Sequence, residues 1–202
     1  CIFIGESIAG GTTTALAVLK ALGYDVNVSS SFATNPTGLK TQVVKDAFSR
    51  AGIKEGSLKN DPLRAVTEVG DPMMPAALGL MRGLAKTKVV LAGGTQMAAV
   101  LALGAALGIE GDISIATTKY IMEDTTAHFR EIVESLGRPY YYSDPGLENS
   151  KIPSVQIYAQ GYVKEGVGMG GAALLAAING VPREKLVEET DHVLMTVELP
   201  KK

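Results

Sequence analysis

The stretch KVVLAGGTQMAAVLA, residues 88–102, decides the fold class of this chain. It begins with a short β-branched run typical of a buried strand and ends with an apolar helical run, and Gly93-Gly94-Thr95 lies between them. The N-terminal part repeats this order, because the apolar run 2–4 is followed by Gly10-Gly11-Thr12 and then by apolar residues. A strand that ends in a glycine turn and continues into a helix is typical of βαβ units with a parallel sheet.

The rest of the chain continues this alternation of short apolar runs and longer helical patterns. It predicts an α/β protein, and we expect a three-layer, Rossmann-like fold with a mainly parallel sheet flanked by helices. Asp124 is a predicted N-cap, and Gly52 and Gly137 are predicted to end helices. The predicted strands are 2–4, 26–30, 88–91, 112–116 and 139–142, and the predicted helices are 12–22, 39–51, 73–84, 96–107, 124–136, 170–179 and 183–191.

Composition excludes several classes of protein. Lys and Arg number 19 against 21 Asp and Glu, so the chain has no basic field to attract nucleic acid or an anionic membrane. The longest apolar runs, 97–109 and 167–178, are well short of the ~20 residues of a membrane helix. The single cysteine, Cys1, and the absence of a Cys/His cluster predict a cytoplasmic protein without a bound metal.

Length and sequence together describe the domain organisation. The 202 residues, 46% of them apolar, are enough for one sizeable core, so we expect residues 1–202 to form a single α/β nucleotide-binding domain. The chain begins Cys1-Ile2-Phe3-Ile4, which is typical of the interior of a strand. We therefore expect this domain to be the C-terminal portion of a longer chain.

The first glycine loop, residues 5–14, has the composition of an anion site. Its glycines allow a close backbone approach, Thr12 and Thr13 can donate to phosphate oxygens, and no lysine precedes them as in a Walker loop. Two such loops at one sheet edge would form a cradle for phosphate or carboxylate. The alternative is that any tight strand-to-helix turn uses Gly and Thr. Glu6 would repel phosphate, so we expect it to accept a hydrogen bond from a hydroxyl, such as that of a ribose, or else to be solvated.

The last glycine loop, residues 164–171, contains the pattern GxGxxG at Gly166, Gly168 and Gly171. A dinucleotide site needs a strand just before this pattern and a βαβ unit after it, and too little chain follows, which disfavours NAD. We expect no cofactor. Glu165 beside this loop is suited to act as a general base if apolar neighbours raise its pKa, although such carboxylates are as often structural. Thr117-Thr118-Lys119 ends a predicted strand and would reach a ligand or cap a turn.

These loops resemble motifs of the nicotinate-nucleotide:dimethylbenzimidazole phosphoribosyltransferase family, most closely its archaeal branch. The family's Gly-Glu-Met-Gly-Ile-Gly-Asn-Thr-Thr falls on residues 5–13, and its Glu-Gly-Thr-Gly falls on residues 165–168. Between them, Lys40 precedes a Val-Val pair as in the family, and residues 68–70, 90–94 and 143–146 match further motifs. The sequence departs from the family at Ile8, Gly11, Ala92 and Val167.

The resemblance implies transfer of phosphoribose from nicotinate mononucleotide to 5,6-dimethylbenzimidazole or a related base. The product, α-ribazole 5'-phosphate, supplies the lower ligand of cobalamin. It also implies a homodimer and a catalytic base at Glu165. The departures favour an alternative, a phosphate- or nucleotide-binding protein of the same fold without catalysis. The expected substrate-binding residues are Glu6, Gly10, Gly11, Thr12, Thr13, Lys40, Gly93, Gly94, Thr95, Gly166 and Gly168.

Overall fold

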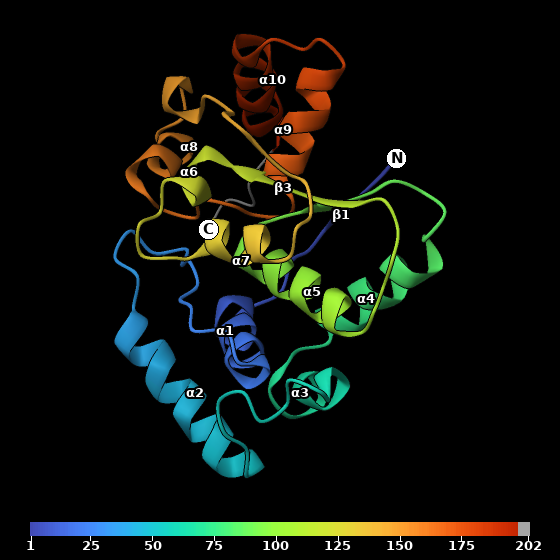
Figure 1. Ribbon diagram of the computed structural model, residues 1–202. Coiled ribbons are helices and arrows are strands. Elements are labelled where there is room, and N and C mark those ends of the chain that lie inside the picture. The colour runs from blue at the N-terminus through green and yellow to red at the C-terminus, as the bar shows by residue number, and fades with distance from the viewer. Residues whose placement is uncertain (198–202) are drawn as a thin grey trace.

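A single parallel sheet organises the computed structural model, which describes residues 1–197 (Figure 1). The sheet has four strands in the order of the chain: β1 (Ile2–Gly5), β2 (Val89–Ala92), β3 (Ile113–Thr118) and β4 (Tyr140–Ser143). Gly5 lies opposite Ala92, and Thr118 lies opposite Ser143. Because every pair is parallel, the carboxyl ends of all four strands meet at one edge. Residues 198–202 of the expected domain lie outside the described residues.

Helices connect the strands. Between β1 and β2 lie α1 (Gly11–Leu22), α2 (Thr37–Ala51), α3 (Pro62–Val69) and α4 (Met73–Gly83). Helix α5 (Thr95–Ala106) joins β2 to β3, and α6 (Lys119–Met122) and α7 (Phe129–Ser135) join β3 to β4. After β4 come η1 (Leu147–Asn149), α8 (Pro153–Gln156), η2 (Ile157–Gln160), α9 (Met169–Ile178) and α10 (Arg183–Thr196).

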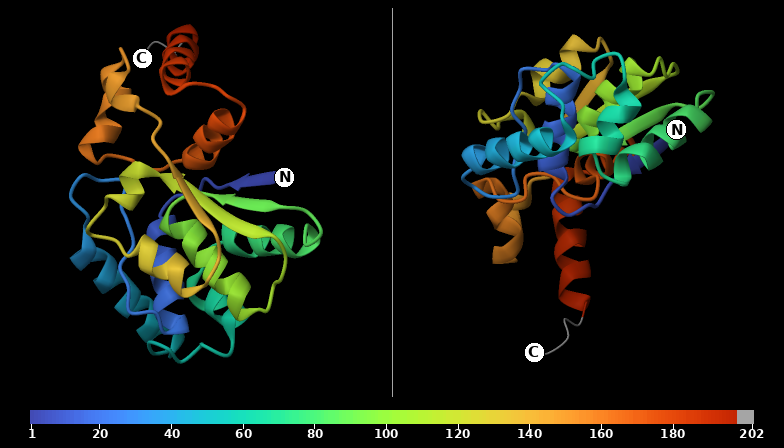
Figure 2. Two further views of the ribbon diagram at one scale, coloured as in Figure 1. Left: turned by 45° about the horizontal axis from the view of Figure 1, so that its top comes forward. Right: turned by 90° about the horizontal axis from the view of Figure 1, so that it is seen from below.

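The helices cover both faces of the sheet, which confirms the predicted α/β architecture. Helices α1, α5 and α7 pack together on one face, and α9 crosses the other face in contact with all four strands (Figure 2). Strands β2 and β3 are therefore buried along their whole length, which explains their continuous apolar and β-branched sequences. The core lies between the sheet and the layer of α1 and α5, whose inward side chains are almost completely buried.

Two glycines allow α9 to lie directly on the sheet. A side chain at Gly170 would overlap the backbone of Thr117, and one at Gly171 would overlap the side chain of Ala92. Ala92 stands where the family named above has Asp, and it is 2% exposed beneath this helix. A longer side chain at position 92 would therefore push α9 away from the sheet.

The predicted strand 26–30 is wrong, because this segment runs beside the sheet without joining it. Side chains take the place of a strand partner. The Lys40 ammonium donates to the Ser29 carbonyl, Thr95 Oγ1 accepts from the Ser29 N–H, and His128 Nδ1 accepts from the Asn27 N–H. Buried backbone groups must be paired, and these distant side chains satisfy them as a ladder would.

The predicted helix 124–136 is also wrong in its first turn. Residues 124–128 form a turn instead of a helix, and α7 begins only at Phe129 after His128. Asp124 is not its N-cap: Asp124 Oδ1 accepts from Thr126 N and Oγ1, which closes a turn, and Oδ2 accepts from Ser29 Oγ at 2.6 Å. A short aspartate side chain in a connection can bond its own local backbone instead of opening a helix.

Other helix ends are as expected, but three helices were not predicted: α3 and the four-residue α6 and α8. Gly52 has φ 64° and ends α2, and Gly137 has φ 63° just beyond α7, so both terminations are confirmed. The sequence analysis missed α3, although Asp61 caps it by accepting from Arg64 N and Pro62 occupies its first turn. Within residues 1–197, no helix has both the length and the apolar character that crossing a membrane requires.

Candidate functional site

The first, second and last glycine loops meet at the carboxyl edge of the sheet. A side chain added at Gly5, at the end of β1, would lie 2.7 Å from the Val167 carbonyl oxygen. Gly168 would meet both Gly5 and Ala92 at 3.1 Å, and its φ of 82° is rarely adopted by other residues. Residues as far apart in the sequence as Gly5 and Val167 therefore form one surface, because only glycine permits so close an approach.

Glu165 lies at the centre of this surface. Its carboxylate accepts hydrogen bonds from Gly166 N at 3.1 Å and from Gly170 N at 3.1 and 3.3 Å, at the start of α9. Burial, with a smaller contribution from the charge of Glu6, raises the pKa of Glu165 to about 7, although these backbone N–H groups act in the opposite direction. At neutral pH a substantial fraction is ionised, so this carboxylate can accept a proton in an apolar environment.

Glu6 follows β1 and faces the same edge. Burial raises its pKa, a hydrogen bond from the Ile8 backbone opposes this effect, and the charge of Asp71 adds to it. Glu6 Oε2 is buried and has no hydrogen-bond partner among the described residues. A buried carboxylate oxygen without a donor is costly, so this atom is suited to accept a hydrogen bond from a ligand.

A small cleft beside Glu165 collects several of the predicted site residues. It is lined by Glu165, Thr12, Gly94, Thr95 and the serines of residues 29–31. Its enclosed volume is about 20 Å³, enough for roughly one water molecule. A larger ligand requires the walls of this cleft to part or lies across its mouth.

The structure divides the two threonines of the first loop. Thr12 lines the cleft beside Glu165, whereas Thr13 lines a separate groove with Val44 and Gly70, where α1 meets α2 and the end of α3. Gly10 has φ 74° at the N-cap position of α1, and a side chain at Gly11 would collide with Gln96. Among the N-terminal loop residues, Thr12 and not Thr13 therefore shares a cleft with the candidate base.

The second loop is packed tightly at the start of α5. A side chain at Gly93 would meet Met97, and one at Gly94 would lie 3.7 Å from Glu165 Cβ, so Gly94 brings α5 next to the candidate base. Thr95 is 1% exposed, and its hydroxyl accepts from the Ser29 backbone.

Lys40 is not an open cation beside the cleft. Its ammonium donates to the Ser29 carbonyl at 2.5 Å and to Asn35 Oδ1 at 3.0 Å, and the side chain is buried. Burial, together with the charge of Lys164, lowers the pKa of Lys40 to about 8, although the charge of Asp124 acts in the opposite direction. Lys40 thus contacts the cleft wall from behind.

Sequence reasoning missed Lys164 and Asp124, which form a buried ion pair at 3.4 Å behind the cleft. The sequence showed Lys164 only as the first residue of the last glycine loop and Asp124 only as a predicted N-cap. It also missed the serines 29–31, whose run of small polar residues directly after an apolar segment was the available signal.

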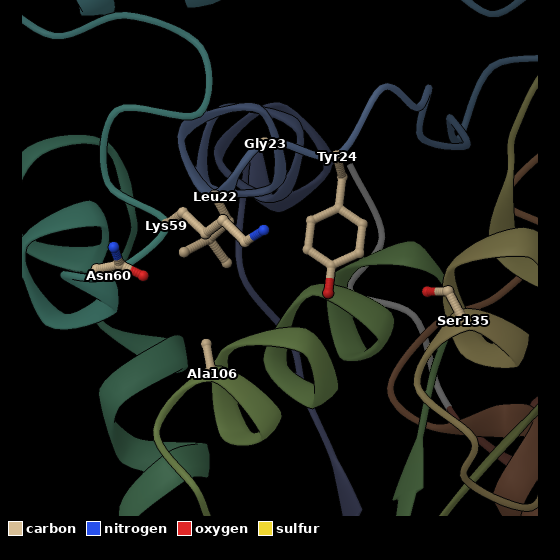
Figure 3. Close-up of a pocket in the computed structure, with 7 residues that line it drawn as sticks. All are labelled: Leu22, Gly23, Tyr24, Lys59, Asn60, Ala106 and Ser135. Carbon is tan, nitrogen blue, oxygen red and sulfur yellow. The ribbon is translucent and has the colours of Figure 1, made fainter.

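A more voluminous pocket lies at the opposite end of the strands, away from all the predicted site residues (Figure 3). It encloses about 450 Å³ between Gly23, Ala106 and Ser135, each at the carboxyl end of a helix, with the exposed Lys59 at its rim. Helix carboxyl ends carry partial negative charge and disfavour anions. Its volume alone would favour this pocket as a ligand site, but the carboxyl ends of the helices that line it do not fit an anionic nucleotide.

The GxGxxG pattern does not occur in a dinucleotide fold. The loop follows η2 rather than a strand, and the described chain beyond it contains α9 and α10.

An apolar cavity of about 270 Å³ lies on the side of α9 away from the sheet and is lined in part by Leu147, Tyr158, Met169 and Ala173. Met169 of this lining directly precedes Gly170, whose N–H donates to Glu165, so this cavity lies close to the candidate base.

Comparison with known proteins gives names but no activity. No family model matches the chain. It is 48% identical over 196 residues to a UPF0284 protein of Methanosarcina acetivorans, a match that covers 95% of this chain and 56% of the relative. The UPF0284 protein of Thermococcus kodakarensis is 48% identical over 205 residues, covering 98% of this chain and 60% of the relative. The chain therefore spans little more than half the length of the curated relatives that it matches.

Proposed function

We propose that this protein transfers phosphoribose from nicotinate mononucleotide to a ring nitrogen of 5,6-dimethylbenzimidazole or a related base. The position of Glu165 carries the proposal. A carboxyl group whose pKa burial raises to about 7 lies where the loop before α1, the start of α5 and the last glycine loop converge. Ligands of open parallel sheets bind at this edge, and general bases work best near the ambient pH.

The proposed chemistry needs one proton acceptor. Glu165 takes the N–H proton of the attacking azole, the azole nitrogen forms a bond to C1' of the ribose, and the bond from C1' to the nicotinate nitrogen breaks. The pyridinium nitrogen departs with the bonding electron pair, and nicotinate leaves as a stable carboxylate. No general acid is required on the leaving-group side.

Several features support binding of a phosphorylated ribose at this edge. The N-termini of α1 and α5 offer free backbone N–H groups and the positive ends of two helix dipoles. Glu6 Oε2 is available to accept from a ribose hydroxyl. The apolar cavity beside Met169 and Tyr158 suits the surface of an aromatic base. The proposal includes a homodimer that acts in cobalamin biosynthesis, as the resemblance implies, and a cytoplasmic location, as the cysteine content predicts.

Nicotinate release is the direct test. The full-length protein is incubated with nicotinate mononucleotide and dimethylbenzimidazole, and the products are separated chromatographically. We expect nicotinate and α-ribazole phosphate in equal amounts. If the full-length protein releases no nicotinate with any benzimidazole or purine base, the assigned reaction is wrong.

A binding protein without catalysis is the second candidate, and the nearly closed cleft beside Glu165 favours it. So do the departures from the family motif at Ile8, Gly11, Ala92 and Val167. Calorimetric titration separates the two: affinity for the nucleotide without turnover in the presence of acceptor bases supports the binding protein, whereas turnover excludes it.

A further inference from the structure

The backbone that carries Glu165 has an unusual conformation. Val163, Lys164 and Val167 have φ values of 59°, 61° and 52°, which residues with side chains rarely adopt, least of all β-branched valines. Lys164 N donates to the Tyr162 carbonyl at 2.6 Å and Glu165 N donates to the Val163 carbonyl at 2.7 Å, so two tight turns follow each other. Such a conformation persists only where surrounding contacts hold it.

Lys164 supplies those contacts from both its side chain and its backbone. The ammonium donates to the carbonyls of Ser30 at 2.9 Å and Phe32 at 3.1 Å, and it lies 3.4 Å from Asp124 Oδ2. The Lys164 carbonyl accepts from Thr118 Oγ1 at 2.5 Å. Lys164, the residue directly before the candidate base, is thus attached to β3, to the turn at Asp124 and to the segment that contains the serines 29–31.

The attachment joins the two walls of the cleft. Residues 29–31 form one wall and Glu165 belongs to the other, and Lys164 connects them with a side chain that is only 7% exposed. Burying an ammonium requires desolvation that an apolar side chain would avoid, so a buried lysine is a poor choice for stability alone. Its contacts with the Ser30 and Phe32 carbonyls and with Asp124 instead fix the direction and the extension of the Lys164 side chain. This suits a residue that must hold the neighbouring Glu165 in place.

We propose that Lys164 is a positioning residue that holds the Glu165 carboxylate, in its buried position, against the serine wall of the cleft. For its chemical consequence this inference rests on the proposed function, because turnover matters only if Glu165 is the base. The geometric part of the inference does not rest on the proposed function, because the position of Glu165 can be measured without a substrate.

The test replaces the lysine and measures both turnover and the carboxylate. In Lys164→Met we expect kcat to fall at least tenfold while KM for nicotinate mononucleotide changes less than threefold. We also expect the pKa of Glu165, measured by carbon-13 NMR of the carboxylate and from the pH profile of kcat, to fall toward the ordinary value of glutamate. Removal of a nearby positive charge alone would raise this pKa, so a fall reports exposure of the displaced carboxylate. The groups nearest to Glu165, Glu6 and Tyr158, remain in the variant.

Controls keep the proposal falsifiable. Lys86→Met removes an exposed lysine at the other end of β2 and should change neither quantity. If Lys164→Met does not fold, Thr118→Val removes the bond to the Lys164 carbonyl without a change of charge, and its adjacent control is Thr117→Val. A folded variant that retains the wild-type kcat and Glu165 pKa overturns the proposal. If wild type shows no transfer but the pKa of Glu165 still falls in the variant, the proposed function fails and the positioning role stands.

Discussion

Adjacent threonines on β3 differ in what their hydroxyls do. Thr118 Oγ1 donates to the Lys164 carbonyl and accepts from Ile121 N, whereas Thr117 Oγ1 is buried with no partner among the described residues. An unmade buried hydrogen bond is costly, and so is the loss of one that is made. The same substitution should therefore have opposite effects at these two positions.

We expect Thr117→Val to leave the free energy of unfolding unchanged or to raise it by about 1 kcal/mol, because it removes an unpaired hydroxyl. Thr118→Val should lower it by about 1–3 kcal/mol, because it leaves a buried carbonyl and a buried N–H unpaired. Urea denaturation of both variants measures the difference. Equal effects at the two positions would mean that the Thr117 hydroxyl has a partner in solution.

Replacing the candidate base separates chemistry from binding. Glu165→Gln keeps the size of the side chain but cannot take a proton from the azole. We expect nicotinate release to fall at least a hundredfold, within the range that general bases contribute, while the dissociation constant of the nucleotide changes little. A comparable loss of calorimetric affinity would make Glu165 a ligand contact instead.

The pH dependence of turnover follows from the same carboxylate. Burial raises the pKa of Glu165 to about 7, so the group is protonated and inactive as a base at pH 5 and ionised at pH 8. The rate should rise tenfold per pH unit below about 7 and level off above it. Steady-state rates between pH 5 and pH 9 measure this, and a plateau that already begins near pH 5 would contradict the raised pKa.

Helix α9 depends on the absence of side chains where it touches the sheet. An alanine at Gly170 would overlap the Thr117 backbone, which cannot move without disrupting β3. We expect Gly170→Ala to lower the free energy of unfolding by at least about 3 kcal/mol and to displace the N–H groups that bind Glu165. Loss of α9 signals in hydrogen exchange would accompany this change.

Gly79 is the matched control, since it is an exposed glycine inside α4 with nothing within 4 Å of an added side chain. Gly79→Ala should raise the free energy of unfolding by about 0.5–1 kcal/mol, because alanine is the better helix former. If both alanines had similar effects, the close contact of α9 with β3 would be wrong.

At the scale of the whole molecule, a ligand at the carboxyl edge would connect the two ends of the chain. The loop before α1 and the loop before α9 contact each other at this edge, through Gly5, Val167 and Gly168. Ligand that binds only the folded state adds stability, about 2.7 kcal/mol at a concentration 100 times its dissociation constant. The whole fold should therefore respond to binding.

We expect nicotinate mononucleotide to raise the melting temperature and NAD to leave it unchanged, because the GxGxxG loop follows η2 instead of a strand. A thermal melt with each compound measures this. Stabilisation by NAD alone would favour the dinucleotide interpretation of Gly166, Gly168 and Gly171.

The sequence by itself determined the sheet and most of its helices. Four of the five predicted strands and the glycine turns after β1 and β2 depend on local patterns: β-branched runs, apolar periodicity and turn residues. The strand predicted at 26–30 failed because its composition suits a strand, while its hydrogen-bond partners belong to no strand and include the Lys40 ammonium and both the ring and the backbone N–H of His128. Asp124 failed as a cap for the same reason, since Ser29 and Lys164 bind its second oxygen.

The candidate site shows the same division. The sequence singled out Glu165, Glu6 and the three glycine loops, because a glycine turn before a helix, in two cases with an acidic residue beside it, is a local pattern. Only the tertiary structure decided that Thr12 and not Thr13 shares a cleft with Glu165, that Lys40 is buried behind the cleft wall, and that Lys164 holds the loop. Local propensity acts between neighbours in the chain, whereas burial, and with it the pKa of Glu165, depends on which distant segments pack around a group.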